Sequence, residues 1–142
     1  MNRRKLVAWA LAAALAALPA WAAGLTITSA WSRATPPGVT VGVAYFTLKN
    51  DTGKPDRLLK ISSPIASKAR VHRTEILDGI ARMREVAVLH VDAGQALEFA
   101  PNGMHVMLMG LKQPLVEGKT FEIELLFEVA GPRTVKVAIR KN

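Results

Sequence analysis

The sequence contains no cysteine. A domain of this size without disulfides must be held together by the packing of its core. The absence also excludes a lipid-bearing cysteine at a cleavage site, a zinc–thiolate site and a blue-copper centre, whose thiolate ligand is obligatory. Any metal that this chain binds must therefore use other ligands.

Long apolar runs are also scarce. Residues 6–17 form an apolar segment that is shorter than the ~20 residues needed to span a bilayer. Basic residues at positions 3–5 precede it and the small-residue pattern Ala20-Trp21-Ala22 follows it. This order is typical of a secretory signal peptide cleaved near Ala22 or Ala23. The general secretory route is preferred to the twin-arginine route, which the two adjacent arginines leave open.

We therefore expect residues 1–23 to be a signal peptide and residues 24–142 to be a single domain. About 119 residues are enough for one hydrophobic core. The expected product is a soluble periplasmic protein without a membrane span, and a monomer.

Acidic residues are fewer than basic ones, 11 against 19, which gives a net charge of +8. The charge falls to about +5 when the three basic residues of the signal peptide are removed. The remaining basic residues are scattered, and an exported protein does not meet nucleic acid. They are interpreted as a solubilising surface with some attraction to acidic partners or anionic lipid.

Short apolar segments separated by turn residues every 8 to 12 positions indicate an all-β sandwich or barrel. Alternation is clearest at residues 121–128, where apolar side chains are interleaved with Glu122 and Glu124. Residues 64–70 can hold one helical turn. The expected strands are 26–31, 41–49, 57–63, 70–77, 80–89, 96–99, 105–109, 121–129 and 134–140.

Two histidine–methionine pairs carry the chemistry of this sequence. If Asp78-Gly79 is a two-residue hairpin turn, Met83 lies opposite Thr74, and His72 and Met83 become diagonal neighbours about 7–8 Å apart. His105 and Met107 are two residues apart on one strand, so they share a face at about 6.6 Å. Two such pairs brought together can surround one ion.

Two imidazoles and two thioethers form a soft, neutral ligand set. Thioether sulfur selects Cu(I) over zinc, magnesium or calcium, and without thiolate the ion is held in a form that can be passed on. In the same register Glu85 lies opposite His72 and is a candidate acceptor for its non-ligating N–H.

Structural roles remain open for each of these residues, because a single histidine on a strand is more often exposed or hydrogen-bonded and a single methionine more often fills the core. Met109 is expected to fill the core, although it can also serve as a spare sulfur. Met104 points to the other face and has no assigned role. His90 is expected in an exposed loop.

The arrangement H-x10-M-x21-H-x-M and its surroundings resemble the periplasmic copper chaperones often called PCuAC. The similar segments include Asp78-Gly79-x-x-Arg82-Met83-Arg84, the stretch from Pro101 to Leu111, and Ala30-Trp31-x-Arg33-Ala34-Thr35-Pro36-Pro37-Gly38. The resemblance implies a cupredoxin-like, Greek-key β-sandwich that binds one Cu(I) through His72, Met83, His105 and Met107.

The resemblance also implies delivery of copper to the copper-bearing subunit of cytochrome c oxidase, or exchange with a thioredoxin-like assembly protein. The chain is therefore expected to be a binding and delivery protein and not an enzyme. The alternatives are a copper storage or tolerance protein, a cupredoxin-like redox protein, and an adhesion sandwich without metal.

Overall fold

The computed structural model describes residues 24–141, and the predicted signal peptide lies outside them. The described chain is all-β, as predicted, and within it no helix is long and apolar enough to cross a membrane. The strands are β1 (Leu25–Arg33), β2 (Val41–Asn50), β3 (Asp56–Ser62), β4 (Ala66–Leu77), β5 (Ile80–Glu85), β6 (Leu89–Val91), β7 (Ala96–Glu98), β8 (Met104–Leu111), β9 (Thr120–Phe127) and β10 (Gly131–Arg140).

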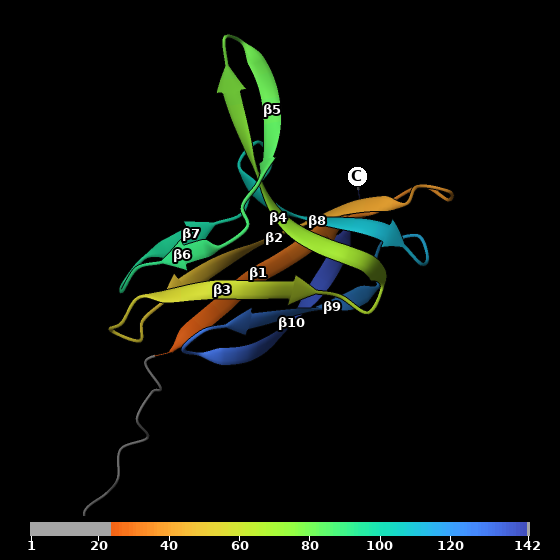
Figure 1. Cartoon of the computed structure of the whole chain (residues 1–142). Helices are drawn as coiled ribbons and strands as arrows, with labels where there is room; N and C mark the ends of the chain where they lie inside the picture. The colour runs from red at the N-terminus through yellow and green to blue at the C-terminus, as the bar shows by residue number, and fades with distance from the viewer. Residues whose placement is uncertain (1–23, 142) are drawn as a thin grey trace, which may run out of the picture.

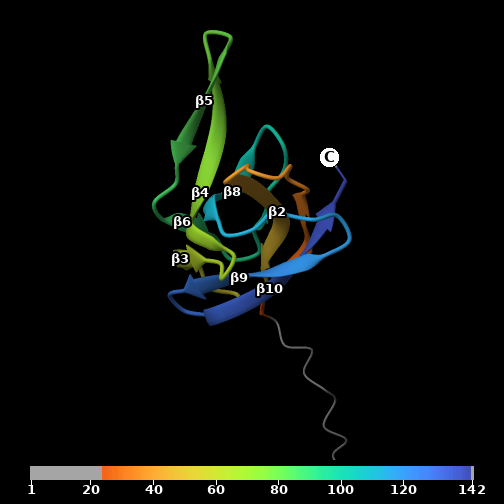
Figure 2. The same cartoon turned by 90° about the vertical axis from the view of Figure 1, so that its right-hand side faces the viewer.

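The strands form one continuous sheet that folds over into two layers (Figures 1 and 2). Its order is β5-β4-β8-β2-β1-β10-β9-β3-β6, with β7 paired to β2. Strand β1 joins the layers, because it pairs antiparallel with β2 and parallel with β10. Its register shifts between Thr28 and Trp31, and Ser29 has a φ of 54° there. This irregularity turns the strand from one layer toward the other.

The core lies between the two layers and follows the predicted alternation. In β9 the side chains of Phe121, Ile123, Leu125 and Phe127 are buried, while Glu122, Glu124 and Leu126 on the other face are exposed. Within the core the ring of Phe46 on β2 stacks on that of Phe99, which directly follows β7 on the neighbouring segment, with centroids 4.3 Å apart. Burial of each such large side chain contributes roughly 1.5–3 kcal/mol to folding, which a chain without disulfides depends on.

One buried carboxylate ties the start of β3 to the β9–β10 turn. Asp56 accepts hydrogen bonds from the backbone N–H groups of Val129, Ala130 and Arg57 at 2.7–2.9 Å. Burial acts to raise the pKa of Asp56, but these backbone donors outweigh it and hold that pKa below its ordinary value of 3.8. The carboxylate is thus ionised and stabilises this corner of the sandwich.

Strands β4 and β5 extend beyond the sandwich as a two-stranded ribbon (Figure 1). Residues 66–73 of β4 pair with β8 and residues 72–77 pair with β5, so His72 and Arg73 have a partner on each side; all residues of β5 are exposed. Asp78 and Gly79 have φ values of 53° and 74°, as a type I′ turn requires. The predicted register is confirmed, with Leu77 opposite Ile80 and Thr74 opposite Met83.

Three expectations for this part of the chain are wrong. The strand expected over residues 80–89 is divided, because the backbone leaves β4 where Val86 N–H donates to the Val71 carbonyl, and β6 then pairs with β3. His90 is exposed as expected but lies in β6, not in a loop. The possible helical turn at 64–70 is a tight turn followed by β4.

Candidate metal centre

His72 and His105 lie directly opposite each other on β4 and β8, at the junction of the ribbon and the sandwich. Their ring centroids are 5.9 Å apart and the rings are nearly perpendicular, at 86°. The sequence alone did not predict this contact, because the pairing joins strands that are far apart in the chain. It brings the two expected histidine–methionine pairs together.

Each of these histidines has a buried ring nitrogen with no hydrogen-bond partner among residues 24–141: Nδ1 of His72 and Nε2 of His105. The Nδ1 of His105 lies 3.1 Å from the carbonyl oxygen of Gly103. A carbonyl can only accept, so Nδ1 of His105 carries the proton and Nε2 keeps its lone pair. Burial of an unpaired lone pair is costly, which indicates that this nitrogen awaits a ligand.

Burial lowers the pKa of His72, and the neighbouring His105 lowers it further, whereas the Glu85 carboxylate acts to raise it. The result is a pKa below the ordinary value of 6.5. His72 is therefore neutral at pH 7, and a neutral imidazole is the form that binds a metal.

The two methionines lie on the same face as the histidines, on opposite sides of His72. Met83 lies opposite Thr74, which makes it a diagonal neighbour of His72 across β4 and β5. Met107 lies opposite Arg70, which makes it a diagonal neighbour of His72 across β4 and β8. Such neighbours are about 7–8 Å apart, within reach of long side chains. All four candidate ligands thus lie on one face of the sheet, with Met83, His105 and Met107 as the cross-strand neighbours of His72.

The candidate ligands differ greatly in exposure. His105 is 4% exposed, and Met83 is 61% exposed. His72 and Met107 are half-buried. One side of the centre therefore belongs to the packed body, and the other side is the exposed thioether of Met83 on β5.

Glu85 lies opposite His72, as its register predicted. Its carboxylate, however, binds the Nε of Arg70 at 3.2 Å, and the hydrogen bonds within residues 24–141 include none between Glu85 and His72. In this structure Glu85 is thus paired with Arg70 and not with His72. The two charges beside the centre neutralise each other.

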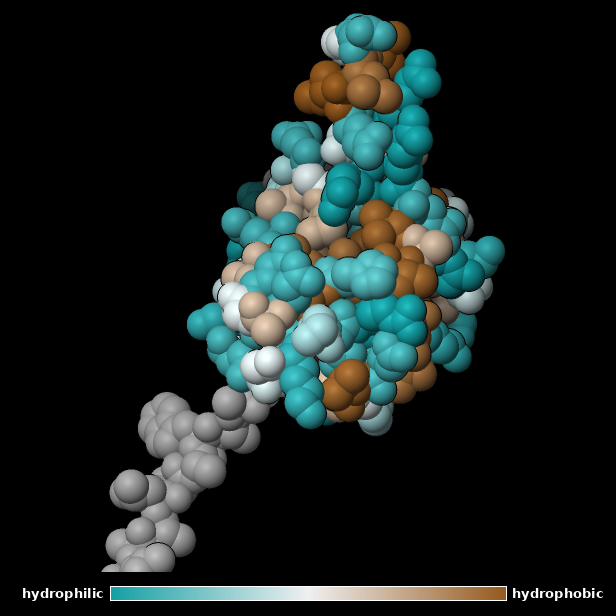
Figure 3. All heavy atoms as spheres, turned by 60° about the vertical axis from the view of Figure 1, so that its left-hand side comes forward, coloured by the Kyte–Doolittle hydropathy of each residue, from teal (hydrophilic) through white to brown (hydrophobic). Residues whose placement is uncertain are grey.

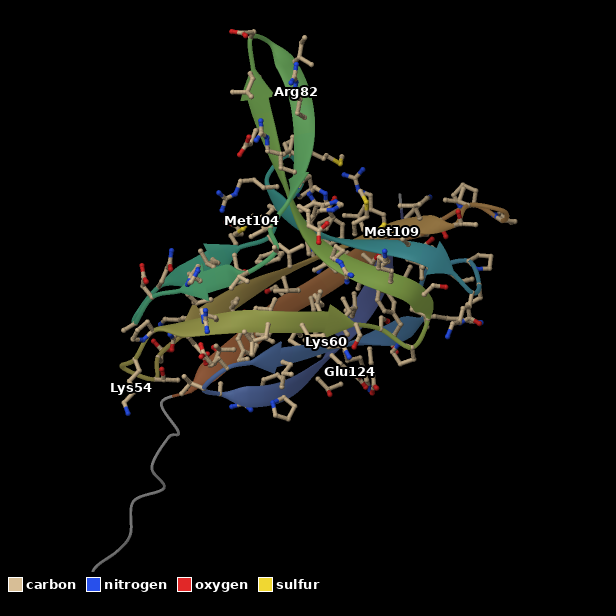
Figure 4. All side chains as sticks on the ribbon, in the orientation of Figure 1. Lys54, Lys60, Arg82, Met104, Met109 and Glu124 are labelled. Carbon is tan, nitrogen blue, oxygen red and sulfur yellow. The ribbon has the colours of Figure 1, made fainter. Side chains whose placement is uncertain are left out.

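The other methionines of β8 lie on either side of the sheet. Met104 is buried, faces the core side as predicted, and its sulfur is 3.5 Å from a guanidinium nitrogen of Arg73. Met109 shares the face of Met107 and is half-buried, outside the buried core, so the expectation that it fills the core is wrong. Figure 4 shows Met104 and Met109 on opposite sides of the base of the ribbon.

The chemistry of this centre depends on sulfur. Within residues 24–141 no group of three or more histidine, cysteine, aspartate or glutamate side chains is placed to hold a metal ion. Two neutral imidazoles and two thioethers are a donor set for a soft, monovalent ion. The unpaired nitrogens of His72 and His105 fit such an ion, because metal ligation would satisfy both.

Sequence reasoning missed two groups that shape the centre. The Gly103 carbonyl fixes the tautomer of His105. Every residue has a backbone carbonyl, so a sequence motif cannot indicate this contact. Arg70 forms an ion pair with Glu85, the residue opposite His72. Arg70 lies two residues before His72 on the same strand, so the alternation of side chains predicts that both lie on one face of the sheet.

The architecture is that of PCuAC domains. The copper-bound PCuAC domain from PmoF2 superposes with a TM-score of 0.70 at 24% identity, over 83% of this chain and 93% of that domain. CuI-DR1885 from Deinococcus radiodurans superposes with a TM-score of 0.66 at 33% identity, over 87% of this chain and 84% of that chain. The predicted cupredoxin-like β-sandwich is confirmed.

A family profile described as "Putative lipoprotein LpqE-like" matches residues 25–139, and the chain belongs to this LpqE-like family. The putative lipoprotein Lxx21020 of Leifsonia xyli subsp. xyli is 32% identical over 118 residues, which cover 82% of this chain and 70% of that protein. Protein RP573 of Rickettsia prowazekii is 30% identical over 129 residues, or 88% and 71% of the two chains. The resemblance to PCuAC proteins is thereby confirmed.

Proposed function

We propose that this protein is a periplasmic copper chaperone that binds one Cu(I) through His72, Met83, His105 and Met107. The observation that carries the proposal is the pair of unpartnered ring nitrogens on two opposed histidines, on the same face as two methionines. Thioether and imidazole together favour Cu(I) over harder ions.

Two similar structures support copper as the ion. One is a copper-bound PCuAC domain and the other is a CuI form. The second is 33% identical to this chain over most of its length. Copper is the cargo of such a protein and not a resident catalytic group, so we propose no enzymatic activity.

Delivery proceeds by stepwise ligand exchange, and the differences in exposure set its order. Met83 is the most exposed candidate ligand and lies on an edge strand, so an acceptor ligand displaces it first. The imidazole of His105 is held by Gly103 and buried, so it leaves last. The ion thus passes outward from the body of the sandwich toward the ribbon.

The acceptor we propose is the copper-bearing subunit of cytochrome c oxidase or a thioredoxin-like copper assembly protein. We propose further that residues 1–23 are removed on export and that residues 24–142 act in the periplasm as one monomeric domain. Storage of copper is the alternative that shares the same centre, and a failure to pass copper to any thiolate acceptor would favour it.

Titration of the purified protein with Cu(I) under reducing conditions tests the proposal. We expect one equivalent per chain, no visible absorption from the d10 ion, and release to a competing thiolate chelator. His105→Ala removes the buried nitrogen and should abolish stoichiometric binding, whereas His90→Ala, an exposed histidine of β6, should leave it unchanged. Two tightly held equivalents, or equal loss in both variants, would contradict a single centre at these residues.

A further inference from the structure

The ribbon exposes apolar side chains that the sandwich does not need. Four of the exposed large hydrophobic residues lie on it: Ile76, Leu77, Ile80 and Met83. Met83 belongs to the candidate metal centre, but the other three lie around the turn, where Ile76 is 71% and Ile80 is 57% exposed. Figure 3 shows hydrophobic side chains gathered near the end of the ribbon, with hydrophilic ones next to them along its length.

The pairing register divides the ribbon into two faces of different character. His72, Thr74, Ile76, Ala81, Met83 and Glu85 share one face, which we call the ligand face. Arg73, Glu75, Leu77, Ile80, Arg82 and Arg84 share the other, which we call the basic face. The candidate ligands His72 and Met83 and the arginines of the basic face therefore lie on opposite sides of the ribbon.

The basic face carries a net positive charge. Glu75 binds Arg84 at 3.1 Å, and no salt bridge within residues 24–141 includes Arg73 or Arg82. Both of these arginines are exposed. The face thus combines an apolar end, formed by Leu77 and Ile80, with two guanidinium groups closer to the body that no carboxylate of the described residues neutralises. The guanidinium of Arg73 also lies 3.5 Å from the sulfur of Met104.

We propose that the basic face and the end of the ribbon rest on an anionic phospholipid surface. Leu77 and Ile80 enter the boundary between headgroups and acyl chains, which apolar side chains reach to a depth of about 5–10 Å. At about 3.3 Å per residue, Arg82 and Arg73 stand roughly 10–20 Å from the apex, where they meet lipid phosphates. Asp78 at the apex keeps the insertion shallow.

The composition of this face favours a lipid surface over a protein partner. Stable protein interfaces bury about 800 Å² on each side and are anchored by aromatic residues, whereas the ribbon is narrow and residues 72–85 contain no aromatic ring except that of His72. A fluid surface requires no shape complementarity. The orientation also leaves the ligand face, with Met83, open to a copper acceptor.

Sedimentation of the purified protein with vesicles tests the proposal. We expect partitioning onto vesicles containing about one-third phosphatidylglycerol, little onto pure phosphatidylcholine, and loss as salt is raised. Each arginine near an anionic surface strengthens partitioning about fivefold. Arg73→Ser combined with Arg82→Ser should therefore weaken partitioning at least tenfold. Replacing both by lysine should preserve most of it. Leu77→Ser with Ile80→Ser should also weaken it at least tenfold.

Matched controls lie on other elements. Lys119→Ser with Lys136→Ser removes the same charge from exposed positions elsewhere, and Val129→Ser removes an equally exposed apolar side chain. Both should partition like the parent. Amide chemical shifts of β4 and β5 verify that each ribbon variant keeps the hairpin. The proposal would be overturned if the protein did not bind anionic vesicles, which is the result expected if the basic face recognises an acidic protein instead. It would also be overturned if the control variants lost as much partitioning as the ribbon variants.

Discussion

The sandwich and the ribbon are built by opposite means. The sandwich is held by pairings between distant strands and by side chains such as Phe46 and Phe127, each 1% exposed. The ribbon is held by one local turn, and every residue of β5 is exposed. The candidate metal centre lies where the two meet, with His105 in the body and Met83 on the ribbon. In the function that we propose, this division lets the body hold the ion while the ribbon releases it.

The largest predicted difference between the two regions is in stability. Phe46→Ala removes a buried ring stacked on Phe99 and should lower the free energy of unfolding by about 3–5 kcal/mol. Ile76→Ala on the ribbon removes an exposed side chain and should change it by less than about 0.5 kcal/mol. Urea unfolding of both variants measures the difference. Comparable losses would show that the ribbon packs as part of the core.

A second test concerns the polar corner of the body. Asp56→Asn replaces one carboxylate oxygen by an N–H group that opposes a backbone donor, so we expect a loss of about 2–3 kcal/mol. The pKa of Asp56 is lowered in the folded state, so its contribution is present above pH 3.8 and is lost as pH falls through the folded value. Acid unfolding of the variant should therefore depend less on pH in this range.

Thr52→Ala serves as the control for Asp56, because it removes a hydrogen-bonding side chain from the exposed β2–β3 turn. Thr52→Ala should lower the free energy of unfolding by less than half as much as Asp56→Asn. An Asp56→Asn variant whose acid transition matches that of the parent would mean that another carboxylate controls acid stability.

The smallest predicted effect is a change in the titration of His72. Its pKa is lowered in the folded protein, so the unfolded chain binds more protons below about pH 6.5 and the copper-free protein loses stability as pH falls from 6.5 toward the folded value. Glu85→Gln removes the charge that raises this pKa and should lower it further. Titration of the imidazole proton resonances of the copper-free protein measures the pKa of His72 in the parent and in the variant. A higher pKa of His72 in the Glu85→Gln variant would contradict this prediction.

The ribbon was the most predictable part of the molecule. Asp78-Gly79 demands a two-residue turn, and the turn alone fixes the register that places Met83 beside His72. Likewise His105 and Met107 share a face by strand alternation. These relations are local in sequence, so propensity and periodicity determine them.

The sequence could not reveal contacts between distant strands. The pairing of His72 with His105 and the fold-over of β1 depend on the packing of the whole sandwich. The division of the strand expected at residues 80–89 escaped prediction because the segment Val86-Ala87-Val88 contains no glycine, proline or other turn residue. Only competition with β3 for hydrogen bonds and burial ends β5 there.

The most direct test of the central claim compares three methionines by Cu(I) competition titration. Met83→Leu, Met107→Leu and Met104→Leu each nearly conserve volume, so each should lose less than about 1.5 kcal/mol of stability in thermal melts. Leucine has no sulfur lone pair. Met83→Leu and Met107→Leu should therefore each lose at least about tenfold in Cu(I) affinity, or ~1.4 kcal/mol, while Met104→Leu, buried on the core side, binds like the parent. Parental affinity in the first two variants, or an equal loss in the third, would contradict a centre at His72, Met83, His105 and Met107.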